Sequence, residues 1–407
     1  MTRAGLCLTL AAAVAGLAAV ATAQEPASPG SQGTRETAAA SSRGVPETRE
    51  AVDAVIDRLG AFDYADRMQA ARTIRRVRGT LALPALLDAA SGHADGYVRY
   101  RALVLLAGYD DPRVADQMEI ALSDPNDRLR AVAYEYFERH PTPRLIPHFV
   151  KAFETELAEF VRPALVRAMA AQGTDPRLQP LLVRDVMRGQ DFFRSSVIEA
   201  LGDYRAAYAL EAITKVAQLE GPLQDDAVMA LGKIGNRQSL PVLAALQRTQ
   251  LRELQPTVAA AICMIGSNCD LHRGFLTRTL TFADRQPGYQ ELLRGAASGL
   301  GALAARGDRE AGRSLFEIGI PSNDPTRAPV ALALAGFAVA NPLELVTLLQ
   351  ERSDRSAALE LLREGFDMLE EDLAEELFFV ELRKAYFAEK DEARKKIMQD
   401  VIVGLEF

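Results

Sequence analysis

Apolar residues recur along the chain in a pattern that repeats nine times and has helical spacing. Each copy begins at an Arg or Gln, and these residues follow one another at intervals of 30 to 37 positions: Arg67, Arg99, Arg130, Arg162, Arg194, Gln224, Gln255, Gln290 and Arg327. The residues three and seven positions later are apolar in every copy. These offsets lie on one face of an α-helix. The pattern therefore predicts nine amphipathic helices in a common register.

A turn and a second apolar helix follow each of these helices. The residue at offset eight is small in seven copies, which lets a neighbouring helix approach closely: Ala107, Ala170, Gly202, Gly232, Cys263, Ser298 and Ala335. The turns are rich in Gly, Asp, Asn and Pro, as at 110–112 and 173–176, and a second apolar segment such as 240–246 comes next. A helical hairpin of about 31 residues cannot bury its apolar faces alone and must stack on its neighbours.

The predicted fold is therefore all-α, an α-solenoid of about nine stacked hairpins with helical caps at both ends. No stretch shows the alternation of a strand. The solenoid is predicted over 47–353, beginning with an amphipathic helix at 47–60, and a C-terminal helical cap over 354–407. Nine acids between 360 and 381 are expected to form the solvated outer face of this cap, or else a docking surface for a basic partner.

Two of the hairpins resemble a known repeat. The segments AlaLeuGlyLysIleGlyAsn at 230–236 with LeuProValLeu at 240–243, and GlyThrAspProArgLeuGlnProLeuLeu at 173–182, resemble HEAT repeats. They are similar in particular to the short HEAT-like repeats first named from phycobilisome lyases. The resemblance covers about 62–350. It implies a solenoid fold but no single function, because lyases, adaptors and scaffolds share these repeats.

The first 46 residues have the composition of an export signal and a linker. Arg3, an uncharged apolar run at 6–20 and the small residues at 21–23 match a signal peptide over 1–23, cleaved after Ala23. The run is too short to favour a transmembrane helix. Ala, Ser, Gly, Thr and Pro dominate 24–46, which predicts a disordered linker. We therefore expect an exported bacterial member of the repeat family, periplasmic or secreted, with no integral membrane span.

Composition narrows the class of partner. The 407 residues are 48% hydrophobic and 25% charged, which is typical of a globular chain. The formal net charge of −8 argues against nucleic acid, because phosphate binding needs a basic surface.

Arginines occur at two repeated positions. Those that begin the first helices are expected to pair with acids of the preceding connections, such as Asp66, Asp95, Asp124 and Asp127, and so to be structural. A second set lies at the turn between the two helices: Arg113, Arg144, Arg177, Arg205 and Arg237. This set is expected along one edge of inner, concave helices. It forms either a cationic ladder for a partner or ion pairs with adjacent acids such as Asp111 and Asp175.

Two cysteines follow the predicted leader, Cys263 and Cys269, with five residues between them. In an oxidising compartment such a pair favours a disulfide, which over so short a loop would contribute about 2 kcal/mol or less. The alternative is that Cys263 fills the small position of its repeat and that Cys269 is a free turn residue. The residues alone leave both interpretations open.

No catalytic residue, metal ligand set or cofactor site is predicted. The four histidines are scattered singly, and the sequence lacks a nucleophile elbow and a phosphate-binding loop. We therefore expect a non-enzymatic scaffold or adaptor that binds a protein or peptide. The alternative, implied by the resemblance, is a lyase-like or chaperone protein that handles a tetrapyrrole.

Overall fold

All nine predicted hairpins are present. The computed structural model describes residues 45–249, 251–283, 288–369 and 371–407. Residues Val45–Phe407 form one compact unit. The predicted signal peptide (1–23), and the predicted linker (24–46) as far as residue 44, lie outside the described residues.

The helices alternate between two sets. The first helices of the hairpins are α2 (Tyr64–Arg76), α4 (Gly96–Leu106), α6 (Asp127–Arg139), α8 (Val161–Ala171), α10 (Asp191–Asp203), α12 (Gln224–Ile234), α14 (Gln255–Met264), α16 (Gln290–Ala305) and α18 (Arg327–Ala340). The second helices are α3 (Gly79–Gly92), α5 (Pro112–Ala121), α7 (Ile146–Thr155), α9 (Gln179–Val186), α11 (Leu210–Ala217), α13 (Leu240–Gln247), α15 (Cys269–Ala283), α17 (Arg309–Gly319) and α19 (Pro342–Gln350). Short 3-10 turns precede three of them: η2 (Pro143–Leu145), η3 (Ala207–Ala209) and η4 (Arg237–Ser239). The prediction of an all-α solenoid is confirmed, and no strand occurs in the described residues.

Additional helices flank this array at both ends. The N-terminal ones are α1 (Arg49–Asp57) and η1 (Arg58–Gly60), and the C-terminal ones are α20 (Arg355–Leu369), α21 (Asp372–Ala388) and α22 (Glu392–Gly404). Helix α20 packs on α18 and so extends the layer of first helices.

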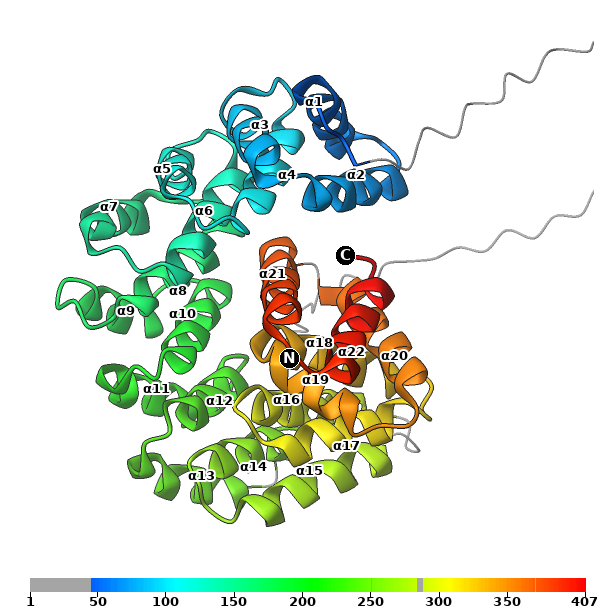
Figure 1. Cartoon of the computed structure of the whole chain (residues 1–407). Coiled ribbons are helices and arrows are strands. Elements are labelled where there is room, and N and C mark those ends of the chain that lie inside the picture. The colour runs from blue at the N-terminus through cyan, green and yellow to red at the C-terminus, as the bar shows by residue number, and fades with distance from the viewer. Residues whose placement is uncertain (1–44, 250, 284–287, 370) are drawn as a thin grey trace, which may run out of the picture. The chain divides into compact units, whose positions relative to one another are not determined.

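The first helices from α4 to α12 lie on the inside of the curved array, and their second helices lie outside (Figure 1). Neighbouring inner helices, such as α10 and α12, pack directly on each other. A Cβ on Gly202 would lie 2.9 Å from the Cα of Ala230, and one on Gly232 would lie 2.5 Å from the Cα of Ala261. The small positions at offset eight are therefore the points where inner backbones meet.

The Arg or Gln that begins each repeat binds mainly backbone carbonyls and, in the described residues, not the carboxylates of Asp66, Asp95, Asp124 and Asp127. Arg194 also pairs with an acid at the start of its own helix, Asp191, at 2.9 Å. In eight of the nine copies its side chain donates to a carbonyl oxygen of the preceding helix or connection: Arg67 to Ala61 and Phe62, Arg99 to His93, Arg130 to Asp124 and Pro125, Arg162 to Phe153 and Glu156, Arg194 to Val186, Gln224 to Ala217, Gln255 to Leu246 and Leu251, and Arg327 to Gly319, Ile320 and Ser322. For the ninth, Gln290, the preceding connection includes residues outside the description.

The expectation of an acid as the main acceptor is wrong for a physical reason. The last carbonyls of a helix have no acceptor role within that helix, and a guanidinium or amide can satisfy them. The nearby acids serve the other helix end instead, since Asp95 accepts the N–H of Tyr97 at 2.8 Å and Asp124 accepts that of Asn126 at 2.7 Å. The conclusion that this arginine column is structural is unaffected.

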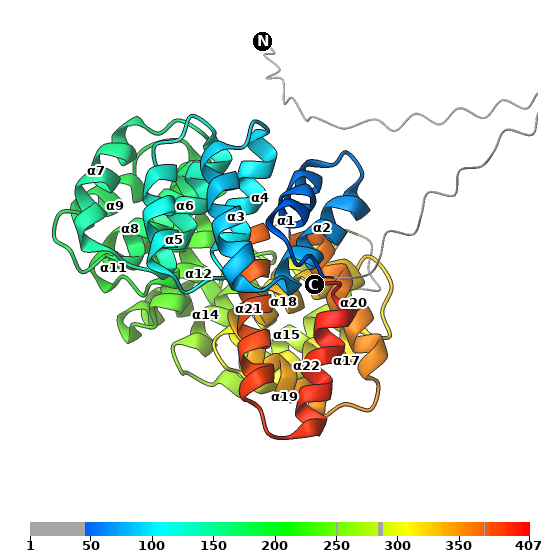
Figure 2. The same ribbon diagram turned by 45° about the horizontal axis from the view of Figure 1, so that its top comes forward.

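The C-terminal helices return to the N-terminal repeats. Helix α21 lies inside the curve beside α4 (Figure 1), and α21 and α22 lie side by side (Figure 2). Arg75 of α2 donates two hydrogen bonds, of 2.9 and 2.5 Å, to one carboxylate oxygen of Glu376 in α21. The two residues are only 9% and 2% exposed. This buried ion pair joins positions that are 301 residues apart in sequence.

Further contacts surround this pair. The guanidinium of Arg75 lies 5.1 Å from the ring centre of Phe379 and 5.6 Å from that of Phe407. Asp372 at the start of α21 forms an ion pair of 2.5 Å with Arg101 and accepts a hydrogen bond from Tyr100. Part of the acidic segment that was expected to face solvent therefore binds arginines of the chain's own N-terminal repeats.

Replacing Arg130 by Ala tests the arginine column. The Arg130 side chain is 18% exposed, binds two carbonyls and also pairs with Glu156 at 2.8 Å, so the change leaves several partly buried acceptors without a donor. We expect the free energy of unfolding to fall by about 2–3 kcal/mol, measured by urea denaturation followed by circular dichroism. Arg144→Ala is the control, because Arg144 is 57% exposed and pairs only at the surface; its loss should stay below about 1 kcal/mol. Equal losses would contradict a structural role of the column.

Replacing Glu376 by Ala tests the contact between the two ends of the array. Arg75 would then be buried without an acceptor, and breaking such a pair costs about 3–5 kcal/mol. The same urea titration measures the change. Glu381→Ala is a matched control, since Glu381 lies on the exposed side of the same helix and should give a nearly unchanged midpoint. A loss for Glu376→Ala no greater than for the control would show that this contact does not stabilise the fold.

Candidate functional site

The larger cavity of the inner surface has a volume of about 1420 Å³ and lies between two walls. One wall comes from α8, α10 and α12 and carries Arg167, Asp203 and Lys233. The opposite wall comes from α16 and α18 and carries mainly small and apolar side chains, including Leu293 and Leu332. The end of α20 forms the floor. An apolar surface of this kind with charged groups at its edge suits a ligand of mixed polarity.

A smaller cavity of about 680 Å³ adjoins the larger one. It lies between the inner helices α4, α6 and α8 and the start of α21. Arg167, Glu199 and Glu371 line both cavities, so the two cavities share one polar edge.

An ion network holds the shared edge. Arg167 donates to Glu138 at 2.8 Å and to Asp203 at 2.7 Å, and Lys233 reaches the other oxygen of Asp203 at 2.7 Å. Burial opposes ionisation of Asp203, but the charges of Lys233 and Arg167 outweigh it and lower the pKa of this carboxyl. Asp203 of α10 is therefore an ionised group, and its two neighbouring cations come from the repeats on either side, Arg167 from α8 and Lys233 from α12.

Two other carboxyls in the cavities lack such compensation. Burial raises the pKa of Glu135 to about 7, and the nearby acids Glu371 and Glu138 add to the rise. Desolvation inside the concave surface also raises the pKa of Glu199, although solvent reaches its side chain. Perturbed carboxyls gathered in a cavity are a common property of functional sites.

The sequence interpretation missed these residues although a signal was present. Glu135, Arg167 and Glu199 all lie at offset five of their repeats. At 100° per residue, offset five points away from the apolar face defined by offsets three and seven. The surface-facing position of the inner helices is thus charged in three successive repeats, and reading that offset would have located the cavity wall.

The five arginines of the predicted ladder are not brought together. Four of them lie at or near the starts of second helices, which are on the outside, so the expectation that the set lines inner helices is wrong for these four. Arg113 pairs with Asp111 at 2.9 Å, Arg177 pairs with Asp175 at 2.8 Å, and Arg144 pairs with Glu119. Arg237 is exposed. Of the five, only Arg205 lines one of the two cavities.

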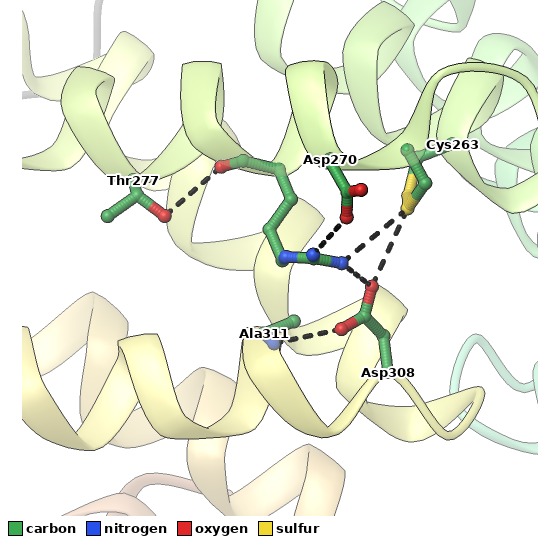
Figure 3. The surroundings of a disulfide bond; sticks show 7 residues. Cys263, Asp270, Thr277, Asp308 and Ala311 are labelled. Carbon is green, nitrogen blue, oxygen red and sulfur yellow. Dashed lines mark hydrogen bonds and ion pairs between the residues drawn. A yellow bond between two sulfur atoms is a disulfide. The ribbon is translucent and has the colours of Figure 1, made fainter.

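Cys263 and Cys269 are joined by a disulfide between the end of α14 and the start of α15 (Figure 3). Asp308 approaches the pair, with its carboxylate 3.5 Å from the sulfur of Cys269. The three side chains bring possible metal-binding atoms within 4.8 Å of one another. Their chemistry fits a metal poorly, because disulfide sulfurs are not thiolates and Asp308 already accepts a hydrogen bond of 2.6 Å from Arg273.

A comparison with protein families agrees with this architecture. The family model for HEAT repeats matches residues 52–136 and 83–170, which cover the first three hairpins and the first helix of the fourth. The chain is a HEAT-like repeat protein. The remaining hairpins of this HEAT-like repeat protein continue the same register to α19.

The solved structures that match this HEAT-like repeat protein have low sequence identity to it. The complex of CpcE and CpcF of phycocyanin lyase from Nostoc sp. PCC7120 is 16% identical, over 81% of this chain and 97% of that one, with a TM-score of 0.26. Yeast importin-beta (Kap95p) is 11% identical, over 87% of this chain and 57% of that one, with a TM-score of 0.37. The HEAT-like repeat protein thus spans less than two thirds of the importin chain. A comparison with curated protein sequences gives no match.

Within the described residues of this HEAT-like repeat protein, no single helix has the length and apolar composition to cross a membrane. Helices α18 and α19 reach the required length and apolar composition only when taken together, and this pair is bent by 117°.

The raised pKa of Glu135 predicts a pH-dependent stability. A carboxyl whose pKa is about 7 in the folded state and about 4.5 when unfolded keeps its proton only in the folded state between these values, so stability falls as pH rises through this window. Glu135→Gln removes the ionisation. The variant should therefore unfold at higher urea concentration than the parent at pH 8, and at nearly the same concentration at pH 5.

The matched control for this pH effect is Glu381→Gln, a substitution at an exposed carboxyl. It should follow the parent at both pH values. If Glu135→Gln also followed the parent at pH 8, the raised pKa of Glu135 would be refuted.

Proposed function

We propose that this HEAT-like repeat protein is an exported, non-enzymatic scaffold that holds a segment of a protein partner in its concave cavity. The observation that carries the proposal is the larger cavity of about 1420 Å³. Small-molecule sites commonly occupy roughly 300–1,000 Å³, so this space fits an extended peptide better than a metabolite. Its walls are packed helices, and a preformed surface loses little conformational freedom on binding.

The side chains that line the cavity support a peptide as ligand. Leu332 and Met368, which are 42% and 39% exposed, offer apolar surface to side chains, while the charged wall offers sites for polar groups. Peptides carry both kinds of group at short intervals. The combination gives specificity through the charges and affinity through the apolar surface.

The alternative of a tetrapyrrole handler has less support in the lining of these cavities. Histidine, cysteine and methionine are the side chains that commonly hold haem iron, and among the described residues that line the two cavities only Met368 is of these types. Absorbance of the purified protein mixed with bilin or haem separates the two proposals, since a shifted absorption band that saturates at one equivalent would favour the tetrapyrrole.

Export forms part of the same proposal and rests on the predicted signal peptide at 1–23. A scaffold in the periplasm would meet its partner in the cell envelope. Cell fractionation should release the protein with the periplasmic contents as a chain that begins at Gln24.

Filling the cavity tests the binding site. Gly336 lies on α18 and lines the larger cavity, and a Cβ placed there meets no atom within 4 Å. Gly336→Trp should therefore fold normally and occupy part of the space. In intact cells treated with a crosslinker and analysed by mass spectrometry, we expect this variant to lose at least tenfold in crosslinked partner.

Gly92→Trp is the matched control. Gly92 is also a helical glycine with open space around its Cβ, and it ends the outer helix α3. This variant should keep the parent's crosslinks. If both variants kept them, the cavity would not be the binding site, and if the parent gave no crosslinks the scaffold proposal would fail.

A further inference from the structure

Two arginines from distant repeats reach the larger cavity. Arg205 follows α10, Arg306 follows α16, and both line the same space from opposite walls. Among the described residues neither side chain has a hydrogen bond or an ion pair. The acid nearest to Arg205 in sequence is Asp203, which already pairs with Arg167 and Lys233 at 2.7 Å each.

The two positive charges act on each other across the cavity. Burial lowers the pKa of Arg306, and repulsion from Arg205 lowers it further, while the attraction of Asp203 is too weak to reverse the shift. Two like charges whose repulsion exceeds the attraction of the neighbouring acid destabilise the fold. An anion placed between the walls would remove this repulsion.

The backbone conformation of Arg205 is a second observation in favour of a ligand. Its φ is +50°, in the left-handed region, within a helix end closed by the hydrogen bond from Ala206 N–H to Leu201 C=O at 2.9 Å. The next two repeats have glycine at the same offset, Gly235 with φ +76° and Gly266 with φ +83°. Glycine adopts this conformation without strain, whereas a side chain does so at a cost. Arg205 therefore has a strained backbone at a position where the next two repeats have glycine, which indicates that its side chain has a function.

We propose that Arg205 and Arg306 form an oxyanion site that takes the carboxylates of an acidic peptide segment. The inference rests on the proposed function and names the class of ligand. Arginine binds carboxylates through paired N–H donors, and two guanidinium groups on opposite walls can hold acidic side chains of one extended segment. A free phosphate would leave most of the 1420 Å³ and its apolar surface unused, so a peptide is the better occupant.

Direct binding tests the site. The probe is a fluorescein-labelled hexapeptide of alternating Glu and Leu, measured by fluorescence anisotropy against the same peptide with Gln in place of Glu. The parent should bind the Glu peptide at least tenfold more tightly than the Gln peptide. Equal affinities would overturn the proposal. Complete displacement of the Glu peptide by inorganic phosphate would also overturn it, provided that sodium chloride at the same ionic strength does not displace the peptide.

Substitution assigns the site to the two arginines. Arg205→Gly removes the charge and the backbone strain together, so it should raise the thermal unfolding temperature while weakening the Glu peptide at least tenfold. Arg306→Gln should weaken the peptide by a similar factor. Arg294→Gln is the control, because Arg294 lines the same cavity but is paired with Glu291 at 2.6 Å, and it should change the affinity less than threefold.

The outcomes separate this inference from the scaffold proposal. If Arg205→Gly and Arg306→Gln bind the Glu peptide like the parent, the oxyanion site is overturned. If the double variant also keeps the crosslinked partner in cells while Gly336→Trp loses it, the cavity still holds a partner and only the acidic ligand is wrong.

Discussion

In eight of the nine repeats, hydrogen bonds from the first helix to the end of the previous repeat join neighbouring hairpins into one body. A helix leaves its last carbonyl groups without donors, and a stack of short helices creates such an end in every repeat. Arg327 binds such oxygens at Gly319 and Ile320 together with that of Ser322, and Arg67 and Arg130 each bind two carbonyls of the connection that follows the preceding helix. Because each donor belongs to the following repeat, the satisfaction of one helix end requires the correct position of the next hairpin. The stacking of one hairpin on the next therefore also provides the hydrogen-bond donors for the end of the previous helix.

The array is also held at its two extremes. Contacts in a repeat protein are mostly between neighbours, so the ends of such an array are normally its least supported parts. Here the buried pair of Arg75 and Glu376 joins the first repeat to a C-terminal helix that crosses the inside of the curve. The start of the same helix lines the smaller cavity, of about 680 Å³, and so occupies part of the concave surface.

The sequence predicted the hairpins and their register because burial of an apolar face depends on local spacing alone. The role of the recurring arginine was also predictable, but its acceptors were not: carbonyl oxygens belong to every residue and leave no mark in the sequence, whereas the nearby acids Asp95 and Asp124 are visible and were taken as the acceptors. The contact between Arg75 and Glu376 was hidden for another reason. No local pattern tells which surface a terminal helix meets 301 positions away. The cavity wall at offset five could have been predicted, since Glu135, Arg167 and Glu199 place a charge at this position in three successive repeats.

The charges of the concave surface are arranged in a way that destabilises the fold, and this arrangement is the strongest argument that the surface binds a ligand. Glu135 is partly neutral at pH 7 because it is buried near other acids, while Arg205 and Arg306 lie elsewhere on the same surface and repel each other more strongly than Asp203 attracts Arg306. The rigid walls keep these groups from neutralising one another. Repeats six and seven show that the turn at Arg205 forms as well with glycine, which removes both strain and charge. A fold that needed only to be stable would have lost this arginine easily. Its presence is explained when a ligand, rather than the chain itself, supplies the opposite charge.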